Sequence, residues 1–368
     1  MKPSGHSTHR RRDGQRGQIL VVGVLSMIAM IGGVALILEG GNAYAHQRIA
    51  QNGADAVANV GATTLAAKLG GATKTDLDVK TAMDGLSVSD GLDSYDGYYT
   101  DWQGHLLTNG GSLAANTSAA AAVGGGSIPA NAQGVQVGGT QAFGTTFGRV
   151  IGINSFNASA DATAVAGVLT GGVFLPVIFP VNIVDCSQNG DIGIGETNWS
   201  ISEPGTPPVG QEYIVPLCKT GGGSFMILDL DGTPNNCADE VANPPNLQFA
   251  GFPVDLQSDN GNNCAKQMMD EVNKRRGQVV LIPICDGDCV TTGGSHATYH
   301  VIKVAAFYLD YMSDTGSDCQ GNGTTIVPIR GNGSSSCIAG WFVRYITTGS
   351  VGGGVVSGAG AVGVQLIR

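Results

Sequence analysis

The chain has 368 residues, which is room for a membrane helix and one or two globular domains. Glycine accounts for 58 residues and charged side chains for only 13%, a composition that favours turn-rich β structure over a helical bundle. The formal net charge of −10 comes with no basic stripe to neutralise phosphates, which argues against nucleic acid as a partner of the main part of the chain.

The first 18 residues form a basic tail. They contain five lysine and arginine residues and one aspartate, a net charge of +4, so residues 19–368 carry −14. Positive charge stays on the cytoplasmic side of a membrane helix, which predicts a cytoplasmic tail over residues 1–18 and an extracytoplasmic C-terminus. Arg10, Arg11 and Arg12 could instead bind nucleic acid, but a few charges next to a bilayer fit the topological role better.

A continuous apolar run begins at Ile19 and ends at Leu38, with no charged residue. A helix of that length spans roughly 30 Å, the hydrocarbon thickness of a bilayer. Residues 19–38 are therefore predicted to form a transmembrane helix in contact with membrane lipid. A cleaved secretory signal is the alternative, because Ala43-Tyr44-Ala45 has the pattern of a cleavage site, although the run exceeds the roughly 7–15 residues typical of a signal. Both interpretations export the remainder of the chain.

Residues 39–70 are predicted to continue the helix as an extracytoplasmic stalk that ends at paired glycines. Glu39 lies at the outer edge of the apolar run, where a carboxylate reaches water. The alanine-rich sequence that follows predicts a packing face made of Ala45, Ile49, Ala56, Val60 and Ala67. Such a face could pack beside similar helices in an assembly, or it could seat the chain's own sheet.

The N-terminal part resembles a known family. Gly17-Gln18 leads directly into the apolar run, a carboxylate-glycine pair ends it, and the sequence QNGADA follows from Gln51. This order closely resembles the N-terminal segment of TadE/TadG-like proteins, which belong to the Flp, or tight-adherence, pilus assembly system of bacteria. The chain has Glu39 where the family often has Asp. It has Gly53 where the family has Ala, a change that weakens a helix by roughly 1 kcal/mol.

A second segment, residues 143–165, resembles a later part of the same family with its sequence FGTTFGRVIGINSFNASADATAV. The resemblance implies a single-pass, surface-displayed bacterial protein that acts in pilus assembly, as a pseudopilin-like or minor pilus-associated component. It also implies that the N-terminal helix contacts other pilus or membrane-complex subunits. Some longer TadG-like proteins carry a von Willebrand-type domain with a D-x-S-x-S metal site. That pattern is absent from this sequence, so metal-dependent adhesion is not expected.

Residues 71–170 are predicted to complete an α+β unit. A short helix starts near Thr75, and an aromatic turn region follows it. Residues 110–134 are low in complexity and are expected to form a flexible loop. Residues 135–137 and 155–165 alternate between apolar and polar side chains, which is typical of strands. The resulting picture is a long helix with strands packed on its outer half.

Residues 171–368 are predicted to form a β-rich, sandwich-like domain. An edge strand is expected at 171–181, and further strands at 212–217, 224–230, 278–284, 300–308, 341–346 and 362–366. All eight cysteines lie in this region, beyond the predicted membrane helix, which indicates disulfides formed in an oxidising compartment. Their connectivity is not predicted; they are Cys186, Cys218, Cys237, Cys264, Cys285, Cys289, Cys319 and Cys337.

One acidic segment has part of a calcium-loop pattern. Asp229, Asp231 and Glu240 have the spacing of its first, third and twelfth positions. Pro234 stands where that loop requires glycine, at the sixth position. The simpler interpretation is a strand that ends in an Asp-Gly turn, with the three carboxylates as weak metal candidates.

A second segment contains the residue types of a zinc site, namely Cys285, Cys289, His296 and His300. The spacer between its cysteine and histidine pairs is shorter than in common zinc fingers, and an exported cysteine pair more often forms a disulfide. We therefore assign no metal and no cofactor to the chain.

The sequence contains no nucleophile elbow, no H-E-x-x-H motif and no P-loop, so an enzyme is not predicted. It favours a membrane-anchored, surface-displayed structural component or assembly factor of a Flp/Tad-type pilus. The alternative is a tethered or secreted binding or adhesion module for glycan or protein, and a secreted hydrolase ranks third. The expected location is the bacterial cell membrane, with the bulk of the chain at the cell surface.

Overall fold

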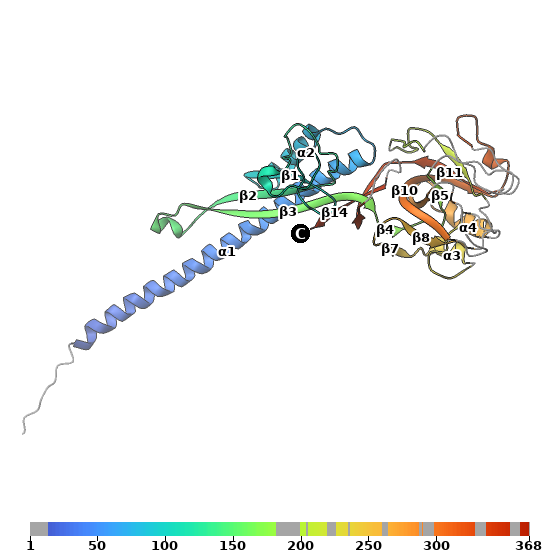
Figure 1. Cartoon of the computed structure of the whole chain (residues 1–368). Coiled ribbons are helices and arrows are strands. Elements are labelled where there is room, and N and C mark those ends of the chain that lie inside the picture. Colours follow the sequence, from blue (N-terminus) through green and yellow to red (C-terminus); the bar gives the residue numbers. More distant parts are fainter. Residues whose placement is uncertain are drawn as a thin grey trace, which may run out of the picture.

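The computed structural model describes residues 14–181, 199–203, 205–218, 226–234, 236–259, 264–286, 289, 298–327, 336–353 and 361–367. The fold is α+β, with one long N-terminal helix followed by a strand-rich region with disulfides. The helix extends away from the rest of the molecule over its first half, and a sheet lies along its second half (Figure 1). A second strand-rich body lies beyond the end of the helix.

Helix α1 (Gly14–Leu69) is continuous over 56 residues, or about 84 Å. Its apolar part, residues 19–38, is not buried by the rest of the protein. Among the described residues, α1 is the one helix long and apolar enough to cross a membrane. This agrees with a single-pass membrane protein. The second half is buried on one side by small and aliphatic side chains, namely Ala50, Ala54, Val57, Ala58, Ala62, Leu65 and Ala66.

The first sheet packs on this half of α1. Its strand order is β1-β2-β3-β14-β12, with β13 also paired to β3. All neighbours are antiparallel except β12 and β14. The strands are β1 (Ser94–Thr100), β2 (Gly134–Gly144), β3 (Ser155–Leu169), β12 (Tyr345–Thr348), β13 (Val351–Gly352) and β14 (Ala361–Ile367).

Helix α2 (Asp76–Ser89) also packs on α1, and the contact depends on glycine. Thr75 and Asp78 form a capping box that starts α2. A Cβ atom added to Gly53 of α1 would lie 2.7 Å from Leu92 Cγ, just after the end of α2. The glycine therefore permits the close approach, at the cost in helix propensity that the sequence predicts.

Residues 110–134 do not form the loose loop that low complexity suggests. They contain a short 3₁₀ turn, η1 (Thr117–Ala119), and bury Ala121 and Val123 against the first core. Asp76 holds the segment to α2, because its carboxylate accepts hydrogen bonds from the backbone N–H groups of Gly124 (2.8 Å) and Gly126 (2.7 Å). The segment therefore has little regular secondary structure, but it is packed against the first core.

The second sheet has the order β5-β9-β10-β11-β6, with β8 paired to β10. Its core is aromatic, with Phe179, Phe307 and Phe342 in mutual edge contact. A separate two-stranded ribbon joins β4 and β7. The strands are β4 (Gly171–Val173), β5 (Phe179–Pro180), β6 (Tyr213–Pro216), β7 (Asn246–Gln248), β8 (Val254–Gln257), β9 (Val279–Cys285), β10 (Thr298–Ser313) and β11 (Cys337–Phe342).

Two short helices in this body, α3 (Cys237–Ala242) and α4 (Cys264–Asn273), pack against each other and were not predicted. The expected strand at 224–230 is also wrong over its described part, since residues 226–230 form only isolated bridges. The remaining short turns are η2 (Gly148–Ile151) and η4 (Asp318–Gln320).

The region expected as one domain, residues 171–368, is divided between the two sheets. Strands β12 to β14 return to the first sheet, where β14 pairs with β3 from Val362↔Val168 to Ile367↔Thr163. In Figure 1 the C-terminal strand lies beside β3 and α1 rather than with the second body. Because the two partners of this pairing are nearly 200 residues apart, local sequence patterns carry no signal for it.

The disulfides predicted from the cysteine count are confirmed for the described residues. Cys237 pairs with Cys264, Cys285 with Cys289, and Cys319 with Cys337. Cys218 is disulfide-bonded as well, and Cys186 lies outside the described residues. The Cys285–Cys289 bond removes the thiolates that the zinc pattern needs. His300 instead contacts Asp255 at 2.8 Å, and His296 lies outside the described residues.

Candidate functional site

The side chains that seat the first sheet on α1 differ from the predicted packing face. Ala45 and Ile49 are exposed, and Ala56, Val60 and Ala67 are half-buried. Of the five, only Val60 packs against the first core, and it lies at the core's edge. The predicted face therefore lies mostly outside the core, exposed at Ala45 and Ile49 and half-buried further along α1. The sheet instead packs on the side of α1 that contains Ala50 and Ala54.

Glu39 joins α1 to the tip of the β2–β3 hairpin. Its carboxylate accepts hydrogen bonds from the backbone N–H groups of Thr146 (3.2 Å) and Phe147 (3.3 Å). Glu39 is the first residue after the apolar run, so this contact fixes the hairpin tip at the height where α1 leaves that run. The sequence predicts that Glu39 reaches water and carries no signal for this contact, because the two partners are more than 100 residues apart.

Near this tip, several apolar side chains are exposed. Val150 is 84% exposed, and Phe156 and Ile153 are also partly open to solvent. Phe143 is buried beside them and stacks on His46 of α1 with ring centroids 4.5 Å apart. The end of the hairpin is thus fastened to α1 by Glu39, by a hydrogen bond from Asn42 Nδ2 to the backbone oxygen of Gly144 (3.4 Å) and by this aromatic stacking. Its exposed apolar side chains face solvent.

The weak metal candidates of the sequence analysis come together in the structure. Asp229, Asp231 and Glu240 each place a carboxylate oxygen within 4.8 Å of the other two. Asp229 and Asp231 flank the turn after Leu228, and Glu240 lies on α3. The cluster is partly open, since Asp231 is exposed while Glu240 is buried.

Glu240 is the unusual member of this cluster. Its Oε1 accepts hydrogen bonds from the backbone N–H groups of Leu230 (2.7 Å) and Asp231 (3.1 Å), but its Oε2 is buried and has no hydrogen-bond partner. The pKa of Glu240 is raised to about 7. Burial is the main cause, the two backbone N–H donors act against it, and the negative charges of Asp231 and Asp229 add to it. The Oδ1 of Asn236 is also buried and without a partner.

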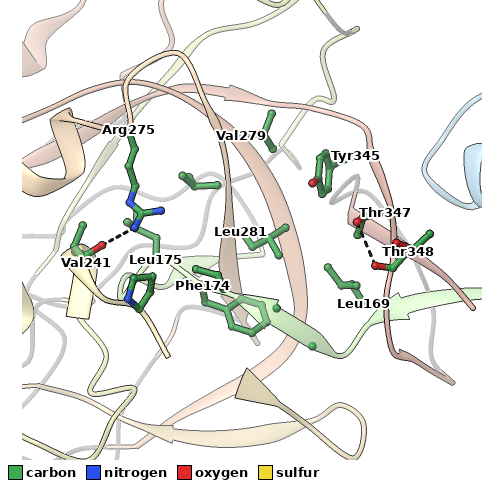
Figure 2. A pocket seen from close by; sticks show the side chains of 15 residues that line it. Leu169, Phe174, Leu175, Val241, Arg275, Val279, Leu281, Tyr345, Thr347 and Thr348 are labelled. Atoms are coloured by element: carbon green, nitrogen blue, oxygen red, sulfur yellow. Dashed lines mark hydrogen bonds between the residues drawn. The ribbon is translucent and has the colours of Figure 1, made fainter. Parts of the chain in front are cut away.

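A cavity of about 310 Å³ lies where the second body meets the end of the first sheet. Its walls are mostly apolar and include Phe174 and Leu281 (Figure 2). Among the described residues that line it, Arg275 is the one with a charged side chain, and its guanidinium donates a hydrogen bond to the backbone oxygen of Val241 at 2.7 Å. Tyr345 lies on the opposite wall. The described lining residues include no carboxylate, histidine or cysteine, which are the usual groups for acid–base or nucleophilic chemistry.

Comparison with known proteins gives no matching family model, no similar curated protein and no similar solved structure.

Proposed function

We propose that the chain is a membrane-anchored structural component or assembly factor of a Flp/Tad-type pilus, and that it has no catalytic activity. The observation that carries the proposal is the division of α1. One continuous helix has a bare apolar half long enough to cross a bilayer and a second half that forms the support of a sheet. Such a helix couples the membrane rigidly to the exported body.

The charge distribution supports an orientation with the N-terminus in the cytoplasm. The net charge of +4 in residues 1–18 fits the cytoplasmic side, and the disulfides on the other side of the apolar run fit an oxidising compartment. The exposed apolar tip of the β2–β3 hairpin, held by Glu39 at the end of the apolar run, suits the membrane interface.

We propose that the face of α1 outside the core, which includes Ala45 and Ala56, contacts other subunits. Ala45 and Ala56 are small enough for a neighbouring helix to approach closely, and neither belongs to the chain's own core. Pilus membership itself rests on the resemblance of residues 17–56 and 143–165 to TadE/TadG-like proteins.

A tethered binding module is the second candidate, and the cavity favours it. Its apolar walls with the single cation of Arg275 suit a small ligand with an apolar body and one negative charge. If this were the main function, Arg275→Ala would abolish the protein's biological effect while leaving pilus formation unchanged.

The test uses the bacterium that encodes the chain. We expect deletion of the gene to reduce surface pili seen by electron microscopy, and expect the wild-type gene to restore them. Two tryptophan variants, one on α1 and one away from it, add a test of the helix surface. Ala56→Trp on α1 should block restoration, whereas Thr108→Trp, in the irregular segment after β1, should not. Normal piliation in the deletion strain would overturn the proposal.

A further inference from the structure

We infer that Asp229, Asp231 and Glu240, together with the amide oxygen of Asn236, form a calcium-binding site. This inference goes beyond the proposed function and does not depend on it. It concerns a loop of the second body that is distant in sequence from both segments of family resemblance. The sequence alone makes these carboxylates weak metal candidates. The structure adds that they lie close together and that Glu240 has a buried oxygen without a hydrogen-bond partner.

The spacing of the three carboxylates suits a single bound ion. Three carboxylate oxygens from two separate elements lie within 4.8 Å of one another. Calcium binds oxygen at 2.3–2.6 Å, so two ligands on opposite sides of one ion are separated by up to about 5 Å. The observed spacing therefore fits one shared ion without movement of the backbone.

Glu240 brings a buried oxygen without a hydrogen-bond partner to the cluster. Glu240 is 1% exposed, and its Oε2 has no hydrogen-bond partner. The Oδ1 of Asn236, one turn before Glu240, is buried and unpartnered as well. Buried carboxylate and amide oxygens without partners are costly, and an ion that accepts their lone pairs removes that cost.

The cluster also concentrates negative charge. The three carboxylates carry up to three negative charges, and none of them forms an ion pair with a lysine or arginine in the part of the chain that the structure describes. Like charges at this separation repel strongly, particularly around a buried member. A divalent cation offsets the repulsion, whereas water does not.

The local fold also holds the ligands in place. Asp229, Asp231 and Glu240 occupy the first, third and twelfth positions of a calcium loop, and α3 begins at the ninth position with Cys237. The disulfide from Cys237 to Cys264 fastens the start of α3 to α4. Glu240 is one turn further along α3, so its position is fixed independently of the ion. Pro234 replaces glycine at the sixth position, and the turn is instead made by Gly232, which has a φ of 79°.

The experiment uses the full-length protein in detergent, freed of metal with a chelator. Calorimetric titration with CaCl₂ should give a Kd of about 10⁻⁴ to 10⁻³ M, the range of extracellular calcium modules, and the melting temperature should rise in about 10 mM CaCl₂. Glu240→Gln and Asp231→Asn should each weaken binding at least about tenfold, since each removes a charged ligand. Asp231 is exposed, so its variant should fold even if the Glu240 variant does not.

Asp239→Asn is the matched control, because Asp239 is an exposed neighbour whose carboxylate bonds Asn243 rather than the cluster. It should bind calcium as the wild type does. Three results would overturn the inference: no heat and no melting shift in wild-type protein with an intact Cys237–Cys264 bond, unchanged affinity in Asp231→Asn, or tighter binding of MgCl₂ than of CaCl₂.

Discussion

At the scale of single residues, glycine decides how closely α2 and its following turn approach α1. An added Cβ at Gly53 would meet Leu92 Cγ at 2.7 Å and the backbone oxygen of Asp90 at 3.2 Å. At Gly61 it would meet Met83 Sδ at 3.0 Å. Glycine at these two positions lowers the helix propensity of α1. It stabilises the fold because it allows α2 and the turn after it to approach α1 more closely than alanine would.

We predict that Gly53→Ala lowers the free energy of unfolding by about 1 kcal/mol. Overpacking against Leu92 costs about 1–3 kcal/mol, which outweighs a gain of up to about 1 kcal/mol in helix propensity. Gly85→Ala is the control, because Gly85 is exposed in α2 with no atom within 4 Å of its added Cβ, and it should be stabilising. Thermal melts of both variants test this, and a higher melting temperature in Gly53→Ala would contradict it.

At the scale of elements, the β2–β3 hairpin is held to α1 at its tip through Glu39. The hairpin extends well beyond the rest of the first sheet (Figure 1). Without the Glu39 contacts, its end would still be held to α1 by the hydrogen bond from Asn42 Nδ2 to the Gly144 oxygen and by the stacking of Phe143 on His46.

Glu39→Ala should therefore loosen the tip without unfolding the sheet. We expect hydrogen exchange at the Thr146 and Phe147 amides to accelerate about fivefold, which corresponds to a loss of about 1 kcal/mol of charge-assisted hydrogen bonding. Asp55→Asn, which changes another carboxylate of α1, one that accepts a hydrogen bond from Gln51, should leave these amides unchanged. Equal exchange rates in Glu39→Ala and wild type would show that the contact does not hold the tip.

Sequence patterns predicted the elements whose periodicity is strong. The continuous α1, strands β2 and β3, and strands β9, β10 and β14 all lie where apolar alternation or an apolar run indicated them. Helices α3 and α4 were missed because they are short, lie in a cysteine- and asparagine-rich stretch and begin at half-cystines. The face of α1 that seats the chain's own sheet was not predicted, because alanine occurs on several sides of this helix and composition alone does not single out one.

The candidate site was predicted in part. The spacing of Asp229, Asp231 and Glu240 was visible in the sequence, and so was the unsuitable Pro234. The buried, unpartnered oxygens of Glu240 and Asn236 were not, because burial depends on the packing of α3 against α4. Neither the cavity at Arg275 nor the contact of Glu39 has a local sequence signal, since each joins segments far apart in the chain.

At the scale of the whole molecule, strand β14 returns the chain to the first sheet after the second body. Strand β14 lies between β3 and β12, and its Val362 is fully buried in the first core. The chain thus leaves the first sheet after β3, forms the second body, and returns. The two bodies cannot be separated by a single cut without removing a strand from the first sheet.

We predict that Val362→Ser destabilises the first sheet by about 2–3 kcal/mol, because it leaves a cavity and an unpaired hydroxyl in the core. Leu366→Ser in the same strand should change stability by no more than about 0.5 kcal/mol, since Leu366 is 45% exposed. Hydrogen exchange of the β3 amides is the appropriate measurement. Similar protection in both variants would mean that β14 is not an integral part of the sheet.

We propose that α1 anchors an exported, disulfide-bonded body in the membrane. This is tested by the intact mass and the non-reducing peptide map of the protein extracted from its native membrane with detergent. We expect a chain that retains residues 19–38, resists release by alkaline carbonate, and carries the Cys237–Cys264, Cys285–Cys289 and Cys319–Cys337 bonds. A soluble chain that begins at His46 would contradict it.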